Sequence, residues 1–422
     1  MNDILAIWSG WIRPSAGLPI VQWSLLLAVA AVAGQVVQRH LALPKVVGYS
    51  AVGALAGLAG FSGAAWPLQG VSLFLLELGI AVVLFEAGGR LPLRWFWHNP
   101  MVLLQSLAEA VLTFAGVYYA MRWMGLSAGV AEALGAIAIV GSPAVLSRVV
   151  LDTRASGPVT ERAMALTTLG ALYALSLVSA RTNVMHRARE TLGDTIYPIA
   201  VVLGLSIVVG ALMALAMRMA LRLMSPTSEN TAILMISVIA AGAALAAHFG
   251  GSAPLAALLG GLMLKQLHPR PWAWPRQLGT AASMLVMLNF VLVSVIAAQA
   301  PWNPAVAGLV LVLLASRALG KLTGVTLANA GSGLGWRQAL WTGCAMQPMS
   351  SVALLLVGRF VASSPSLGPQ IASVALPAIL LLEVLGAIVA TLALHRAGES
   401  ARALAQLAAP APGSTRPGEM NG

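Results

Sequence analysis

About thirteen long apolar runs limit most strongly what this chain can fold into. Each is near the roughly 20 residues that a helix needs to cross the hydrocarbon core of a bilayer. The runs lie at about 20–38, 43–61, 71–88, 100–122, 127–150, 159–180, 195–222, 229–248, 252–267, 277–299, 304–328, 336–361 and 368–395. Hydrophobic residues make up 59% of the chain and charged residues only 9%, too few charges for a soluble domain of this length. We therefore predict an all-α polytopic membrane protein.

The basic residues indicate how the runs are oriented. The net charge is +11, but Lys and Arg are spread along the chain rather than gathered in one soluble patch, so we expect no nucleic-acid partner. Cytoplasmic loops favour Lys and Arg, and an outside N-terminus with an inside C-terminus places most of them there, with Arg162, Arg317 and Lys321 assigned to loops. The basic segment 181–190 conflicts with this arrangement. Either a span near it is misplaced or its arginines lie outside. We expect a bacterial-type inner membrane.

Enzymatic and metal-binding motifs are missing from the sequence. The only cysteine, Cys344, excludes an internal disulfide and a cysteine metal cluster. The chain contains no HExxH, phosphate loop, CxxC or nucleophile elbow. We therefore expect no enzymatic activity, no bound metal and no cofactor.

Two prolines interrupt apolar runs at matching places. The fifth run contains AIVGSPAVLSRVV and the twelfth contains CAMQPMSSVALLLV, while the second and ninth runs, LPKVVGYSAVGALAGLAG and GSAPLAALLGGLML, also resemble each other. Both pairs are seven runs apart, and an odd offset gives the two copies opposite orientations in the membrane. This predicts an inverted repeat over about 20–180 and 229–395, with a connector helix at about 195–222.

The interruptions predict a site halfway through the membrane. Proline removes a backbone donor, and carbonyls freed in hydrocarbon must find partners. Paired broken helices in two repeats are typical of the substrate site of secondary transporters. The predicted ion pathway contains Gly141, Ser142, Pro143, Gln347, Pro348 and Ser350. The alternative is that these prolines only kink packed helices.

Several stretches resemble the monovalent cation:proton antiporters of the sodium/proton exchanger superfamily. They are LPKVVGYSAVGALAG, LELGIAVVLFEAGGRL, ALGAIAIVGSPAVLSRVVLDTRASGPVTERAM, GSAPLAALLGGLML and GWRQALWTGCAMQPMSSVALLL. The resemblance covers roughly residues 20–395. It implies a panel of helices for homodimer formation, a six-helix core with two crossing broken helices, and elevator-like alternating access.

One departure from the family concerns its ion-binding acid. The helix after the first break carries an aspartate in the family, but here it reads ALTTLGALYALSLVSA. Glutamates within membrane runs are functional candidates because a buried acid is costly. We single out Glu383, Glu86 and Glu109 as candidate ion or proton carboxylates, and Glu383 most of all, since its run is the repeat partner of the helix that lacks the aspartate. The alternative for each is a structural carboxylate that is paired or hydrogen-bonded.

Polar residues in other runs complete the candidate pathway. Thr167, Thr168, Ser176 and Asn289 carry oxygens that suit a monovalent cation. The alternative is ordinary hydrogen bonding between or within helices, or capping of a carbonyl.

The expected function is secondary active exchange of Na⁺ or K⁺ for protons by a membrane-embedded homodimer. Two alternatives stay open: a diverged relative that moves another solute without the usual proton coupling, and a transport-inactive regulator that keeps the fold. We expect an N-terminal segment at 1–19, a transmembrane domain at 20–395 and a disordered tail at 396–422, which is polar and rich in Ala, Pro and Gly.

Overall fold

A computed structural model describes residues 17–61, 63–91, 93–184, 192–225, 228–267 and 276–401. These residues form helices joined by short connectors, and none of them lies in a strand. The helices are α2 (Gly17–Val36), η1 (Val37–Leu41), α3 (Lys45–Leu58), α4 (Gly70–Gly89), α5 (Leu93–His98), α6 (Pro100–Trp123), α7 (Ala128–Ile139), α8 (Pro143–Thr153), α9 (Pro158–Val184), α10 (Leu192–Leu223), α11 (Glu229–His248), α12 (Ala253–Leu267), α13 (Arg276–Ala298), α14 (Pro304–Leu327), α15 (Trp336–Ala345), α16 (Ser351–Ser363) and α17 (Gly368–Arg396).

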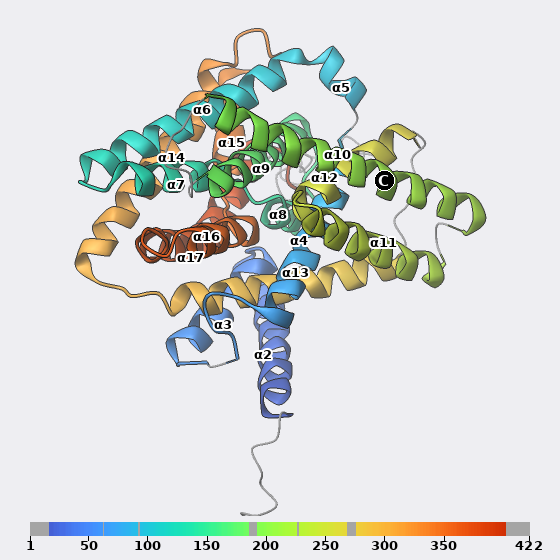
Figure 1. Cartoon of the computed structure of the whole chain (residues 1–422), viewed down its shortest axis with the longest axis horizontal. Coiled ribbons are helices and arrows are strands. Elements are labelled where there is room, and N and C mark those ends of the chain that lie inside the picture. Colours follow the sequence, from blue (N-terminus) through green and yellow to red (C-terminus); the bar gives the residue numbers. More distant parts are fainter. Residues whose placement is uncertain are drawn as a thin grey trace, which may run out of the picture.

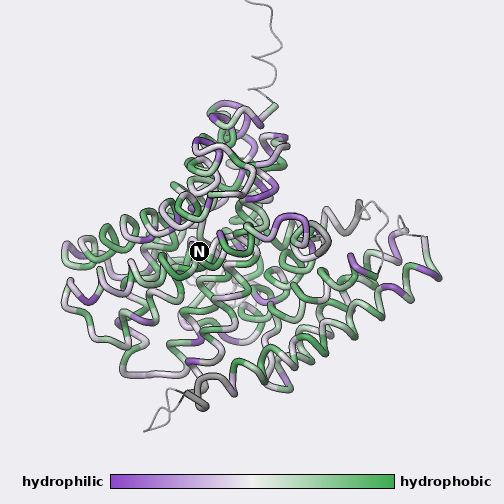
Figure 2. The backbone as a smooth tube through the Cα atoms, turned by 90° about the horizontal axis from the view of Figure 1, so that it is seen from above, coloured by the Kyte–Doolittle hydropathy of each residue, from purple (hydrophilic) through white to green (hydrophobic). Residues whose placement is uncertain are grey.

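The helices confirm the predicted all-α membrane fold. Ten segments of the described chain are long and apolar enough to cross a membrane, and α3, α12 and α16 are shorter apolar helices. Each predicted run corresponds to one helix or to one of the interrupted pairs α2–η1, α7–α8 and α15–α16. Hydrophobic residues cover most of the helices along their length (Figure 2). The short helix α5 lies on a connector and was not predicted.

Helix packing follows the pattern that an inverted repeat requires. In such a repeat α3 corresponds to α12, α4 to α13, and α6 to α14. Accordingly α3 packs along α13 while α4 packs along α12, and α6 packs directly along α14. The broken helix α7–α8 and the red helices α15 to α17 come together in the middle of the molecule, and α2 extends from one side of it (Figure 1). The residue limits of the two repeats and of the connector stay a prediction.

The segment after α17 is more ordered than the sequence suggests. Glu399 and Ser400 are buried, although they fall within the predicted disordered tail. The Glu399 carboxylate accepts 2.8 Å hydrogen bonds from the backbone N–H groups of Val159 and Thr160. These N–H groups lie in the first turn of α9 and have no partner within the helix. By accepting from them, the carboxylate of Glu399 holds the segment after α17 against the start of α9. The rest of the predicted tail, 402–422, and most of the N-terminal segment lie outside the described residues.

Candidate functional site

The two interrupted helices meet at their breaks. Between α7 and α8 the chain is extended, and the backbone N–H of Ser142 donates a 2.9 Å hydrogen bond to the carbonyl oxygen of Pro348 in the break between α15 and α16. Ser142 also caps α8, because its hydroxyl accepts a hydrogen bond from the N–H of Val145. The predicted residues of the two breaks are therefore brought together in the interior.

Arg317 on α14 donates hydrogen bonds to free backbone carbonyl groups at both breaks. Its guanidinium is fully buried. It donates to the carbonyl oxygens of Ala138 and Val140 at 3.0 and 2.8 Å, at the C-terminal end of α7. It also donates to the carbonyl oxygen of Gln347 at 2.7 Å. Carbonyls at a helix C-terminus lack intrahelical partners and carry partial negative charge, so one cation satisfies the ends of two helices.

Lys321, one turn after Arg317, adds a second buried cation. Its ammonium donates to the carbonyl oxygen of Ile139 at 3.1 Å and lies 2.5 Å from Glu109 Oε1 on α6. Lys321 and Glu109 are both fully buried, so the pair is shielded from water. The other carboxylate oxygen, Glu109 Oε2, is buried without a hydrogen-bond partner among the described residues. Glu109 is therefore a charge-compensated acid beside the first break.

Helix α9 faces this break without an acid. Gly170 lies so close that a Cβ atom there would be 3.2 Å from the carbonyl oxygen of Ile139 and 3.9 Å from Glu109 Oε2. At Gly170 α9 thus has no side chain facing Ile139, and the carboxylate of Glu109 on α6 lies close to this position. Thr167, one turn earlier, lies against Gly141 and its buried hydroxyl has no partner within the described chain.

Glu383 on α17 lies beside the second break, in a different environment. Its carboxylate is fully buried. Oε1 accepts hydrogen bonds from the hydroxyls of Ser50 at 2.5 Å and Ser294 at 3.2 Å, and Oε2 accepts one from Ser350 at 2.8 Å. Ser50 lies on α3, Ser294 on α13 and Ser350 in the second break. No Lys or Arg of the described residues forms a salt bridge with Glu383.

The other predicted residues do not join this cluster. Glu86 pairs with Arg90 at the half-exposed end of α4. Thr168 and Ser176 donate to carbonyl oxygens one turn earlier in α9, which is ordinary bonding within a helix. Asn289 donates to the carbonyl oxygen of Leu76 at 3.3 Å and joins α13 to α4.

Two of the most important side chains were assigned wrongly from the sequence. Arg317 and Lys321 were placed in a cytoplasmic loop, but both are fully buried within α14. Arg162, also assigned to a loop, is buried and donates to Gln105 and to the carbonyl oxygen of Ser332. Arg317 lies near the middle of a 24-residue apolar helix, and this position inside a span was the available signal of burial. The convergence of Ser50 and Ser294 on Glu383 had no signal in the sequence.

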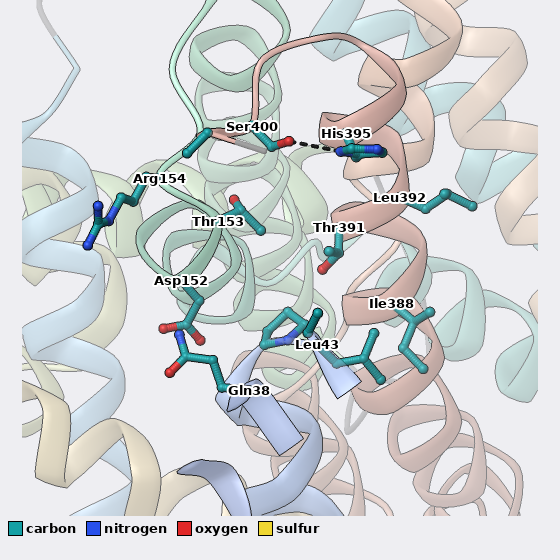
Figure 3. A pocket seen from close by; sticks show the side chains of 13 residues that line it. Gln38, Leu43, Asp152, Thr153, Arg154, Ile388, Thr391, Leu392, His395 and Ser400 are labelled. Atoms are coloured by element: carbon teal, nitrogen blue, oxygen red, sulfur yellow. Dashed lines mark hydrogen bonds between the residues drawn. The ribbon is translucent and has the colours of Figure 1, made fainter. Parts of the chain in front are cut away.

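Cavities approach Glu383 along α17 from opposite ends. One of about 570 Å³ is lined by Ile388, Thr391 and His395 of α17 and by Asp152 at the end of α8. Figure 3 shows these side chains around the cavity, with Arg154 directed away from it. Another, of about 400 Å³, reaches Leu376 of α17. At 1.5 Å rise per residue, the nearest lining residues are about 8 and 11 Å along the helix axis from Glu383, so Glu383 is closed off from both.

A family model described as "Sodium/hydrogen exchanger, transmembrane" matches residues 25–397. The chain belongs to the sodium/hydrogen exchanger family. This family consists of transporters rather than enzymes, and the exchanger described here is an integral membrane protein with several transmembrane helices.

Solved structures agree with this assignment at the level of the fold. The sodium proton antiporter MjNhaP1 from Methanocaldococcus jannaschii at pH 8 is similar with a TM-score of 0.68 and 16% identity, covering 89% of this exchanger and 98% of that chain. An electron-microscopy structure of the same antiporter gives a TM-score of 0.70 and 16% identity, with coverage of 94% and 100%. Comparison with curated protein sequences gives no significant match.

Proposed function

We propose that this exchanger moves a monovalent cation, Na⁺ or K⁺, in exchange for protons, with Glu383 as the carboxylate that holds them in turn. The observation that carries the proposal is the burial of Glu383 among three hydroxyls with no salt-bridge partner in the described part of the chain. A bare carboxylate in such a place is costly. A bound proton or a bound cation removes that cost, and this competition is what antiport requires.

Glu109 fits the exchange role less well because its charge is already balanced. Lys321 lies 2.5 Å away and supplies a permanent partner within the same buried site. Such a pair can hold helices in place without any cargo. We therefore assign Glu109 and Lys321 to the support of the first break and Glu383 to the cargo.

Alternating access is supported by the position of Glu383 between two cavities. Ile388 lines one and Leu376 lines the other, and both lie on α17 with Glu383 between them. Extending one cavity along α17 by the roughly 8 or 11 Å that separates its nearest lining residue from Glu383 would open the carboxylate to that cavity alone. We further propose a homodimer in a bacterial-type inner membrane, with the N-terminus outside and the C-terminus inside.

Transport assays in liposomes test the proposal. Purified protein in vesicles with an imposed pH gradient should dissipate it when Na⁺ or K⁺ is added. Glu383→Gln keeps the size of the side chain but cannot hold an exchangeable charge, and we expect at least a tenfold lower rate, roughly the loss of one essential proton-transfer group. Glu229→Gln, at an exposed position at the start of α11, is the matched control and should keep the parental rate.

Two results would contradict the proposal in different ways. Full exchange by Glu383→Gln would remove this residue from the mechanism. A parent protein that responds to no monovalent cation would favour a diverged transporter of another solute, or a transport-inactive regulator, and the absence of an acid from the middle of α9 gives the first of these its support.

A further inference from the structure

Polar side chains lie at both ends of the boundary between two groups of helices. Helices α3 and α4 pack chiefly against α13 and α12, and we call this group the panel. The broken helices α7–α8 and α15–α16 pack with α9 and α17, and we call this group the core. The proposed alternating access moves the core against the panel, so a polar contact between them at one end is made in one conformation and broken in the other.

One such contact is formed at the C-terminal end of α17. The carboxylate of Asp152, at the end of α8 in the core, accepts a 2.8 Å hydrogen bond from the backbone N–H of Lys45. Lys45 is the first residue of α3 in the panel, so its N–H has no partner within the helix and carries partial positive charge. Asp152 lies beside the cavity of about 570 Å³ (Figure 3). The hydrogen bond therefore ties core to panel at this end.

At the opposite end of α17, two opposite charges face one cavity without pairing. Glu77 on α4 of the panel and Arg359 on α16 of the core both line a cavity of about 230 Å³. They are half-buried and close enough for their charges to attract each other, but no salt bridge of the described residues joins them. Arg359 instead donates a 3.0 Å hydrogen bond to the hydroxyl of Ser179 on α9, within the core.

The chemistry of Glu77 and Arg359 favours pairing once this cavity closes. The attraction between two charges grows as the distance falls and as water leaves the space between them. A guanidinium presents five N–H donors in a fixed fork that matches a carboxylate, so Arg359 has donors left for Glu77 beside its bond to Ser179. Movement of α16 toward α4 would bring the two groups into contact.

From these two places we infer that core and panel are held by alternative polar contacts. The conformation described here is held by Asp152 on the N–H of Lys45, and the opposite conformation by a salt bridge between Glu77 and Arg359. The inference rests on the proposed function, because it assigns residues to the two ends of that transport cycle. Each contact exists in one conformation only, so the loss of either one shifts the population toward the other. These are positioning residues, since they act on the balance between conformations and not on the cargo.

Cross-linking across the cavity measures this balance without transport. Leu73 on α4 and Ala362 on α16 line the same cavity as Glu77 and Arg359, so Leu73→Cys with Ala362→Cys places a thiol on each side and keeps the charged pair. The background is Cys344→Ser, which removes the only native cysteine. A short bismaleimide then joins the two thiols when the cavity closes, and the rate of joining follows the population of the closed conformation.

Variants at the first contact give the direction of the shift. Asp152→Ala should raise the cross-linking rate about tenfold or more, since a lost hydrogen bond to a charged group shifts an equilibrium by that order. Asp152→Asn keeps an acceptor oxygen and should raise the rate less. Glu161→Ala removes an exposed acid on α9 and should leave the rate unchanged.

Reversed charges test the second contact. Glu77→Arg places two cations across the cavity and should lower the cross-linking rate below that of the parent. Glu77→Arg combined with Arg359→Glu restores opposite charges and should bring the rate back toward the parental value. Damage to the fold by either single change would not be repaired by the exchange of charges.

The outcomes separate the inference from the function on which it rests. An unchanged cross-linking rate in Asp152→Ala, or no recovery in the charge-exchanged variant, would overturn the alternative contacts while cation exchange in proteoliposomes stands. A parent that exchanges no monovalent cation would overturn the proposed function, and the shifts in cross-linking rate would still support the two contacts.

Discussion

The backbone N–H of Ser142 donates a 2.9 Å hydrogen bond to the carbonyl oxygen of Pro348. This bond joins two breaks that lie about two hundred residues apart in the chain. If the prolines only kinked their helices, the backbone groups freed at each break would find separate partners in neighbouring helices. Here a backbone donor of one break bonds to a backbone acceptor of the other, and the guanidinium of Arg317 donates to carbonyl oxygens at both breaks.

Arg317→Ala should destabilise the protein strongly. The change leaves the carbonyl oxygens of Ala138, Val140 and Gln347 without the donor that now bonds to each of them. We expect a loss of at least about 3 kcal/mol in the free energy of unfolding, because several buried acceptors become unsatisfied at once. Heating of the purified protein, followed by size-exclusion chromatography, would show this loss as a lower denaturation temperature.

Arg90→Ala provides the comparison for this experiment. Arg90 pairs with Glu86 on the half-exposed end of α4, and such pairs contribute about 0.5 kcal/mol. Similar denaturation temperatures for the two variants would show that Arg317 does not hold the breaks together.

Glu109 and Lys321 should depend on each other. Glu109→Gln or Lys321→Met alone leaves one buried charge without its partner 2.5 Å away, and each should cost about 3–5 kcal/mol. The double variant removes both charges and should be more stable than the sum of the two single losses predicts. A double-mutant cycle on denaturation temperatures measures the coupling. Additive losses would mean that the two side chains act independently.

Glu399→Ala should loosen the start of α9. The carboxylate of Glu399 accepts hydrogen bonds from the N–H groups of Val159 and Thr160 and from the Thr160 hydroxyl. We expect a loss of about 1–2 kcal/mol, as for other removed helix caps, together with faster amide hydrogen exchange at these two residues. Truncation after Ala401 keeps Glu399 and should leave their exchange unchanged. Equal protection in Glu399→Ala would show that this contact does not stabilise α9.

The sequence is sufficient to predict the helices but not to predict which groups their polar side chains contact. Run length alone locates helices such as α11 and α14 within a residue or two, because the bilayer fixes how long an apolar helix must be. The paired prolines at 143 and 348 predict the crossing, since freed carbonyls in hydrocarbon need common partners. Run length is a local signal, and the two prolines lie in runs that are seven apart in the predicted repeat. Both can therefore be read without knowing the tertiary structure.

The partners of the buried charges depend on tertiary packing that no local pattern records. Arg317 and Lys321 were assigned to a loop because basic residues usually mark the ends of spans. Their real partners are carbonyls of α7 and the carboxylate of Glu109, which lie far away in the sequence. Likewise, Glu383 could be singled out as a buried acid, but Ser50 and Ser294 meet it only because α3 and α13 pack closely beside α17.

Glu383 and Ser350 belong to the broken-helix region, whereas Ser50 and Ser294 come from α3 and α13. If the broken helices travel as a unit against those two helices in the proposed alternating-access cycle, an ionised and unloaded Glu383 is tethered by two hydrogen bonds, from Ser50 and Ser294, that must break before any travel. Loading with a proton removes the charge that these hydroxyls stabilise, and loading with a cation turns them away. The carrier would then change conformation slowly when it holds neither a proton nor a cation. Slow return of the empty carrier would prevent the cation gradient from dissipating without moving protons.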